Sequence, residues 1–169
     1  VARVRDLRVL RGVTLDNGPQ PLRILASPKP STDGPVSLDL RAETLGDRPH
    51  LCYTAVVELG STPLTPPHME PLVLTEAGPF RMSVEEAYEQ WLFHGPLFAG
   101  ITEIVRIGDN GIIARLSPSS PRRCLSEAMD VGWLIDPVII DSGLQLLILW
   151  ARTYLDMTPL PSRFGCFHR

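Results

Sequence analysis

The sequence predicts an α+β fold in which an antiparallel sheet wraps around one long buried helix. Two observations lead to this prediction. Residues 1–59 contain four strand-like apolar runs separated by short turn-forming segments, which favours sequential antiparallel strands. Residues 137–154 form a helical segment that is apolar at nearly every angle of the helical wheel, so other elements must cover most of its sides.

The first part of the chain is predicted to be all β. Residues 36–42 alternate apolar and polar side chains with the period of two that is typical of a half-buried strand. The segments between the apolar runs are rich in Asp, Asn, Gly and Pro, which are turn-forming residues. Short turns favour a meander, in which strands adjacent in sequence are adjacent in the sheet. The expected strands are residues 1–9, 21–26, 36–42 and 53–59.

Residues 60–80 differ in composition from what precedes them. This stretch contains five prolines, which fix the backbone φ angle and lack an N–H donor. Because such a stretch cannot form a central strand or a helix, we interpret it as an extended linker. The linker divides the chain into a first part at residues 1–59 and a second part at residues 81–169.

The second part is predicted to begin with a short helix followed by a hairpin. Ser83 and Glu86 have the spacing of a capping box, which starts a helix. Residues 98–107 and 112–116 are apolar runs on either side of Asp-Asn-Gly, a strong signal for a tight turn whose two central residues have positive φ. A further strand is expected at residues 164–167.

The composition argues against several function classes. With 16 basic and 19 acidic residues, the net charge of −3 gives no electrostatic reason to expect nucleic acid or an anionic membrane as a partner. No apolar run reaches the roughly 18 residues that a membrane span needs. The three cysteines are far apart and form no CxxC pair, so we expect no zinc site, no disulfide framework and a cytoplasmic location. They are Cys52, Cys124 and Cys166.

The helix that begins at Asp136 and Pro137 carries the polar pair that most suggests chemistry. Asp141 and Gln145 are four residues apart and therefore share one face of an otherwise apolar helix. Burial raises the pKa of a carboxyl group, and a neutral carboxylic acid is able to donate a proton near neutral pH. The amide of Gln145 is placed to orient that carboxyl group. The alternative is structural, because Asp141 lies in the second turn, where the helix N-terminus tolerates an anion.

A second candidate site lies at residues 94–98, between the predicted short helix and the first hairpin strand. The sequence there is His-Gly-Pro-Leu-Phe. Its histidine is a site candidate because imidazole titrates near neutral pH, although a histidine between a helix and a strand usually has only a surface or packing role. The other histidines have no spacing typical of metal ligands, so no metal site is expected. They are His50, His68 and His168.

Residues 94–98 together with Asp-Pro-Val-Ile-Ile-Asp-Ser-Gly-Leu-Gln at residues 136–145 resemble the dehydratase domains of modular and iterative polyketide synthases. The first segment is similar to that family's Tyr-Gly-Pro-x-Phe motif, and the second to its His-Pro-x-x-x-Asp-x-x-x-Gln motif. Leu160 and Pro161, after the helix, are similar to a further feature of the family. Residues 92–96 are most similar to the dehydratase-like domains of polyunsaturated fatty acid and enediyne-type iterative synthases.

The resemblance implies a double hot-dog fold, which consists of two tandem units that each wrap a curved antiparallel sheet around a long helix. Residues 1–59 would be the later strands of the first unit, and residues 81–169 the front part of the second. Because the chain also lacks an initiator Met, we expect it to be an internal piece of a multidomain synthase. The implied partners are an acyl carrier protein and the other synthase domains. Exposed strand edges also favour a homodimer.

The resemblance also implies a reaction. The family removes water from a β-hydroxyacyl group that is held as a thioester on the phosphopantetheine arm of an acyl carrier protein, and it uses no other cofactor. A His base takes the proton α to the carbonyl, and an Asp acid protonates the departing hydroxyl. Mapped onto this chain, the catalytic pair is Asp141 as the acid and Gln145 as its supporting amide. The residues expected to bind the substrate are His94, Gly95, Pro96 and Phe98.

The chain departs from the family pattern at three points. The family's catalytic His lies in a His-x-x-x-Gly-x-x-x-x-Pro motif, which none of the four histidines matches. His94 replaces the usual Tyr, and Asp136 replaces the usual His. Either the base comes from another part of the synthase or a second chain, or the domain is a non-catalytic scaffold or dimerisation module. A product-template domain, which uses a similar fold and a His/Asp pair for aldol cyclisation, is a further enzymatic alternative.

Overall fold

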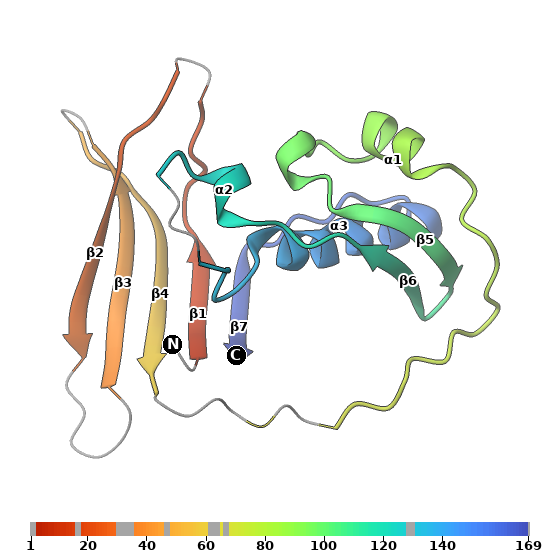
Figure 1. Cartoon of the computed structure of the whole chain (residues 1–169), viewed down its shortest axis with the longest axis horizontal. Helices are drawn as coiled ribbons and strands as arrows, with labels where there is room; N and C mark the ends of the chain where they lie inside the picture. Colours follow the sequence, from red (N-terminus) through yellow and green to blue (C-terminus); the bar gives the residue numbers. More distant parts are fainter. Residues whose placement is uncertain are drawn as a thin grey trace. The chain divides into compact units, whose positions relative to one another are not determined.

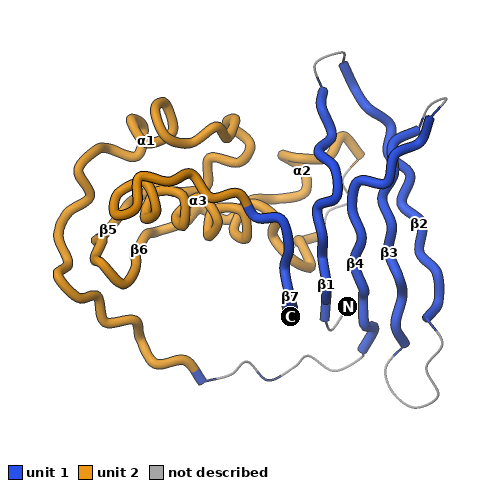
Figure 2. The backbone as a smooth tube through the Cα atoms, turned by 180° about the vertical axis from the view of Figure 1, so that it is seen from behind, with its two compact units in different colours: residues 1–68, 161–169 blue, residues 69–160 orange. Residues whose placement is uncertain are grey.

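The computed structural model describes residues 3–15, 18–29, 36–45, 48–60, 65, 68–127 and 131–168. The chain divides into two compact units (Figure 2). Unit 1 comprises Val1–His68 and Pro161–Arg169, and unit 2 comprises Met69–Leu160. The change of unit after His68 falls within the predicted linker. The assignment of residues 1–59 and 81–169 to a first and a second hot-dog unit stays a prediction.

Unit 1 contains a five-stranded antiparallel sheet in the order β2-β3-β4-β1-β7 (Figure 1). The strand predictions near residues 1–9, 21–26, 36–42, 53–59 and 164–167 are confirmed, with ends that differ by a few residues. The strands are β1 (Arg3–Val9), β2 (Leu22–Lys29), β3 (Val36–Thr44), β4 (Leu51–Leu59) and β7 (Arg163–His168).

The predicted meander is wrong for β1. Strands β2, β3 and β4 are consecutive neighbours, but β1 pairs with β4 on one side and with β7 on the other. The connection between β1 and β2 spans residues 10–21, which is longer than the two to five residues of a hairpin loop. Ion pairs match this order, because Arg5 Nε lies 2.6 Å from Glu58 Oε1 on β4 and Arg163 on β7 lies 2.6 Å from Asp6.

Unit 2 packs helices against a two-stranded antiparallel sheet formed by β5 and β6. The strand predicted at residues 98–107 begins later, at Ile101, because residues 96–98 form a 3₁₀ turn that starts at Pro96. After β6, residues 121–124 form the short helix α2. The elements are α1 (Val84–Gln90), η1 (Pro96–Phe98), β5 (Ile101–Gly108), β6 (Gly111–Leu116), α2 (Pro121–Cys124) and α3 (Pro137–Tyr154).

The capping box predicted at the start of α1 is present. The Glu86 N–H donates to Ser83 Oγ at 3.1 Å, and the Ser83 N–H donates to Glu86 Oε2 at 2.7 Å. Each side chain therefore satisfies a backbone N–H that the first helical turn leaves without a partner. This cap fixes the residue at which α1 begins and hence the face that α1 turns to the core.

The predicted hairpin between β5 and β6 also forms, but its turn differs from the expectation. Gly108 pairs with Gly111, so Asp109 and Asn110 are the two turn residues, and neither has positive φ. Their side chains instead bind the preceding extended segment. Asn110 accepts a hydrogen bond from the Thr75 N–H at 3.0 Å, and Asp109 accepts one from the Thr75 hydroxyl. These side-chain contacts anchor the end of the Pro-rich stretch to the hairpin.

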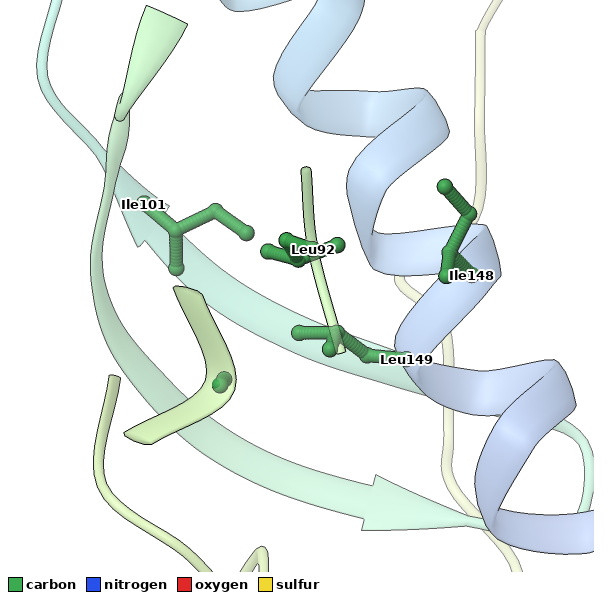
Figure 3. Packing of buried hydrophobic residues seen from close by; sticks show 5 residues of the cluster. Leu92, Ile101, Ile148 and Leu149 are labelled. Carbon is green, nitrogen blue, oxygen red and sulfur yellow. The ribbon is translucent and has the colours of Figure 1, made fainter. Parts of the chain in front are cut away.

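The core of unit 2 lies between α1, α3 and the hairpin. Leu149 extends from α3 toward Leu92 and Ile101 (Figure 3). The predicted helix at residues 137–154 is confirmed, and most of its residues are buried or half-buried, whereas Leu147 is 49% exposed. The sheet of unit 2 has only two strands in the described residues. The buried residues of α3 are Val138, Ser142, Gln145, Ile148, Leu149 and Ala151.

Two leucines on α3 give a matched test of this core. We expect Leu149→Ala, at a fully buried position, to lower the free energy of unfolding by about 3 kcal/mol, because it removes buried methyl groups and leaves a cavity. The control Leu147→Ala, at an exposed position, should cost less than about 1 kcal/mol. Urea unfolding followed by circular dichroism measures both values. Equal losses in the two variants would contradict the described orientation of α3.

Candidate active site

The start of α3 is set by Asp136. Its carboxylate accepts a hydrogen bond from the Val138 N–H at 2.9 Å, which caps the helix as the sequence predicts. It also accepts from the Ser119 N–H at 2.6 Å and the Ser119 hydroxyl at 2.8 Å. Desolvation alone would raise the pKa of Asp136, but these hydrogen bonds outweigh it and hold the pKa below its ordinary value of 3.8. Asp136 is therefore a helix cap that also ties α3 to the loop at Ser119.

Gln145 is the fully buried polar centre of unit 2. Its Nε2 donates to Asp141 Oδ2 at 2.7 Å and to the Phe98 carbonyl at 2.8 Å. Its Oε1 accepts from the Tyr88 hydroxyl at 2.7 Å. The Phe98 carbonyl is only an acceptor, so the amide nitrogen must face it, and this fixes the orientation of the amide. Gln145 thereby presents an N–H to Asp141, as the spacing of the two residues predicts.

Tyr88 completes this network, and it was not among the residues expected to form the site. Its hydroxyl accepts a hydrogen bond from the Ile101 N–H at 3.1 Å. Burial and the nearby charge of Asp141 raise the pKa of Tyr88, although the hydrogen bond from Ile101 opposes this. The hydroxyl therefore keeps its proton and remains the donor to Gln145. Its signal in the sequence is weak, because position 88 shares the inner face of α1 with apolar residues.

The carboxyl group of Asp141 lies in the second turn of α3. Its side chain is 27% exposed, so it is neither enclosed nor in bulk solvent. Among the described residues, no Arg or Lys forms an ion pair with it. The side chain that does approach it is an imidazole, since Asp141 Oδ2 lies 3.3 Å from His94 Nε2. The site therefore brings together the acidic residue of one predicted segment and the histidine of the other.

His94 is held in place by packing. Its ring stacks on Phe93, with the ring centroids 4.5 Å apart, and its side chain is only 13% exposed. Its Nδ1 is buried and has no hydrogen-bond partner. Gly95 and Pro96 contribute backbone geometry instead, because Gly95 is the N-cap of η1 and Pro96 its first residue. Phe98 contributes its carbonyl, while its side chain is 37% exposed.

The backbone at Gly100 lies very close to α3, and this close approach positions η1 and β5 against the helix. Gly100 lies between these two elements, and a Cβ atom at this position would lie 2.7 Å from Val138 Cγ1. Such a distance is too short for a Cβ contact, so any other residue here would force the Val138 and Ser142 side chains, or the helix, to shift. Replacing Gly100 would displace the Phe98 carbonyl that orients Gln145.

The described residues contain no group of three or more His, Cys, Asp or Glu side chains that is arranged to hold a metal ion. The polar side chains of the site come from α1, from α3 and from the segment between α1 and η1. Within the same described ranges, no helix has the length and apolar character needed to cross a membrane.

Residues 66–169 match the family model described as the polyketide synthase dehydratase N-terminal domain. The chain belongs to the polyketide synthase dehydratase family. A curated relative is a component of the polyunsaturated fatty acid synthase of Thraustochytrium sp. It is 28% identical over 164 residues, which cover 94% of this chain and 6% of that protein. The resemblance expected from the motifs at residues 94–98 and 136–145 is thereby confirmed.

Solved dehydratase structures have the same fold. The dehydratase domain of a mycocerosic acid synthase-like polyketide synthase superposes with a TM-score of 0.66 at 18% identity, covering 98% of this chain and 58% of that one. The dehydratase domain of RzxB from Pseudomonas fluorescens gives a TM-score of 0.62 at 19% identity, covering 97% and 57%. The predicted α+β hot-dog fold is confirmed. The chain spans less than two thirds of each of these domains.

The cap at Asp136 predicts a specific dependence of stability on pH. Because the folded-state pKa of Asp136 is lowered, its contribution is present above the ordinary value of 3.8 and is lost as pH falls through the folded-state value. Asp136→Asn keeps a capping oxygen but has no charge. We expect wild type to be more stable than this variant at pH 7, and the difference to shrink at about pH 2.5. Urea unfolding at both pH values measures it, and a difference independent of pH would contradict the cap.

Proposed function

We propose that this chain carries the acid side of a dehydratase site, which removes water from a β-hydroxyacyl thioester. The observation that carries this proposal is that the carboxyl group of Asp141 is held in one orientation by hydrogen bonding. Gln145 donates to Asp141 at 2.7 Å, while Tyr88 and the Phe98 carbonyl fix the amide. A proton donor in dehydration must keep one orientation toward the departing hydroxyl, and this network supplies that constraint. Membership of the dehydratase family supports the same conclusion.

The reaction needs one acid and one base. The base removes the proton on Cα, and the electron pair of that C–H bond forms the C=C bond. The C–O bond at Cβ breaks, and the hydroxyl leaves as water with a proton from Asp141. General acid catalysis of this kind contributes roughly 10²–10⁴ in rate. In this proposal the base is an imidazole of the family's His-x-x-x-Gly-x-x-x-x-Pro motif, which residues 1–169 do not contain.

The substrate and partners follow from the family and its relatives. We propose that the acyl group arrives as a thioester on the phosphopantetheine arm of an acyl carrier protein, so that the chain needs no cofactor of its own. The relative in Thraustochytrium is named as part of a polyunsaturated fatty acid synthase, and this chain covers 6% of it. We therefore propose that the chain works beside other synthase domains, in the cytoplasm.

The acid assignment is tested by Asp141→Asn in the longest polypeptide that contains this chain. An amide cannot donate the required proton, so dehydration should fall by about 100-fold or more. The control is Asp156→Asn, at an exposed position beyond α3, which should dehydrate at the wild-type rate. Formation of the enoyl thioester measures the rate, and circular dichroism checks the fold. Wild-type turnover by a folded Asp141→Asn variant would disprove the assignment and favour the non-catalytic scaffold.

The absence of the family's base motif gives a second test. We expect the 169-residue chain by itself to show no dehydration of a β-hydroxyacyl thioester above the uncatalysed rate, because removal of the α proton has no catalyst. The control is the longer polypeptide at the same concentration. Turnover by the 169 residues alone would show that the base lies within this chain.

A further inference from the structure

A general acid must hold a proton at the start of each turnover. An ordinary carboxyl group has lost its proton at neutral pH, whereas an imidazole titrates close to neutrality. Burial alone does not solve this problem for Asp141, because its side chain is 27% exposed. The adjacent side chain therefore matters for the supply of the proton.

That side chain is His94. Its Nε2 lies 3.3 Å from Asp141 Oδ2, which is within the range over which two titratable side chains interact. The other titratable group in the network is Tyr88, which reaches the pair through Gln145 and stays neutral because burial and the charge of Asp141 raise its pKa. No Lys or Arg of the described residues forms an ion pair with Asp141.

We propose that His94 and Asp141 share one proton and that His94 supplies the proton that Asp141 gives to the leaving hydroxyl. This inference rests on the proposed dehydratase function. In this proposal His94 starts as imidazolium and Asp141 as carboxylate, before the acyl chain binds. When the acyl chain displaces water, the less polar surroundings favour two neutral groups over two charged ones, so the proton passes from Nε2 to the carboxylate.

The step balances in atoms and charge. The Nε2–H bond breaks and an O–H bond forms on Asp141, which leaves His94 neutral. That O–H bond then breaks as its proton joins the hydroxyl oxygen, and the C–O electron pair leaves with the water. The base takes the Cα proton and returns it to solvent, and His94 regains a proton from solvent. The net reaction is loss of one water molecule from the substrate.

The surroundings of His94 favour this direction of transfer. Its Nδ1 is buried without a hydrogen-bond partner, so an imidazolium leaves a charged N–H unsatisfied. An unsatisfied buried N–H costs more free energy on a charged ring than on a neutral one. Loss of the Nε2 proton removes that charge. The imidazole ring stacks on Phe93, with the ring centroids 4.5 Å apart.

The coupling of the pair is testable without enzyme activity. In the 169-residue chain with isotope-labelled histidine, NMR follows the titration of each imidazole, and His94→Gln identifies the His94 signals. We expect Asp141→Asn to lower the midpoint of the His94 titration, because the neighbouring anion that favours imidazolium is gone. His50, in unit 1, is the internal reference and should not change. An unchanged His94 midpoint would overturn the proposal.

The proton supply is tested by the pH profile of dehydration in the longer polypeptide. His94→Phe keeps the ring stacked on Phe93, and His94→Gln keeps an uncharged N–H near Asp141. Neither side chain titrates, so in both variants the fall of kcat/KM at high pH should begin about two pH units lower, with about 100-fold less turnover at pH 7. A wild-type profile for His94→Gln would mean that His94 only orients the carboxyl group, and would overturn the proposal.

These two experiments also separate this inference from the proposed function. If the wild-type polypeptide dehydrates no β-hydroxyacyl thioester at any pH, the proposed function fails. The NMR titration still decides whether His94 and Asp141 share a proton. A shifted profile in His94→Phe together with a lowered His94 midpoint in Asp141→Asn supports the whole proposal.

Discussion

The buried amide of Gln145 is the interaction on which the candidate site depends. An unsatisfied amide in a protein interior costs roughly 1–3 kcal/mol, so its burial requires that every partner be in place. Those partners come from α1, η1 and α3, which are three separate segments of unit 2. The amide therefore couples the spacing of these segments to the orientation of Asp141. Any shift of one segment leaves a buried polar group unpaired.

The sequence determines this arrangement through the two helix starts. The capping box at Ser83 fixes α1 and so directs Tyr88 inward, while Asp136 and Pro137 fix the register of α3. With α3 in that register, Gln145 lies in the core and Asp141 one turn earlier lies at its margin. Local capping interactions thus decide which polar groups meet, before any contact between distant segments is considered.

The features that could be predicted from the sequence are the local ones, and those that could not are contacts between distant segments. The limits of α3 and the pairing of Asp141 with Gln145 are local, since a cap and a spacing of four residues define them. The place of β1 in the sheet, the contact of Tyr88 with Gln145 and the approach of His94 to Asp141 are not local, because segments more than 40 residues apart in sequence form them. The position of the hairpin turn was predicted, but the positive φ angles expected for its two central residues were wrong. The side chains of Asp109 and Asn110 bind Thr75 instead, and this contact is not local in sequence.

Two departures from the family pattern have different physical consequences. Asp136 precedes Asp141 by five residues, which on a helix places the two about 140° apart around the axis. The carboxylate of Asp136 caps α3 and accepts hydrogen bonds from Ser119. His94 Nε2 instead lies 3.3 Å from Asp141 Oδ2. The motif around Asp141 has thus lost an imidazole, while the motif around residues 94–98 has gained one. Since the reaction depends on which groups surround the carboxyl rather than on which motif supplies them, the altered motifs do not by themselves argue against an acid at Asp141.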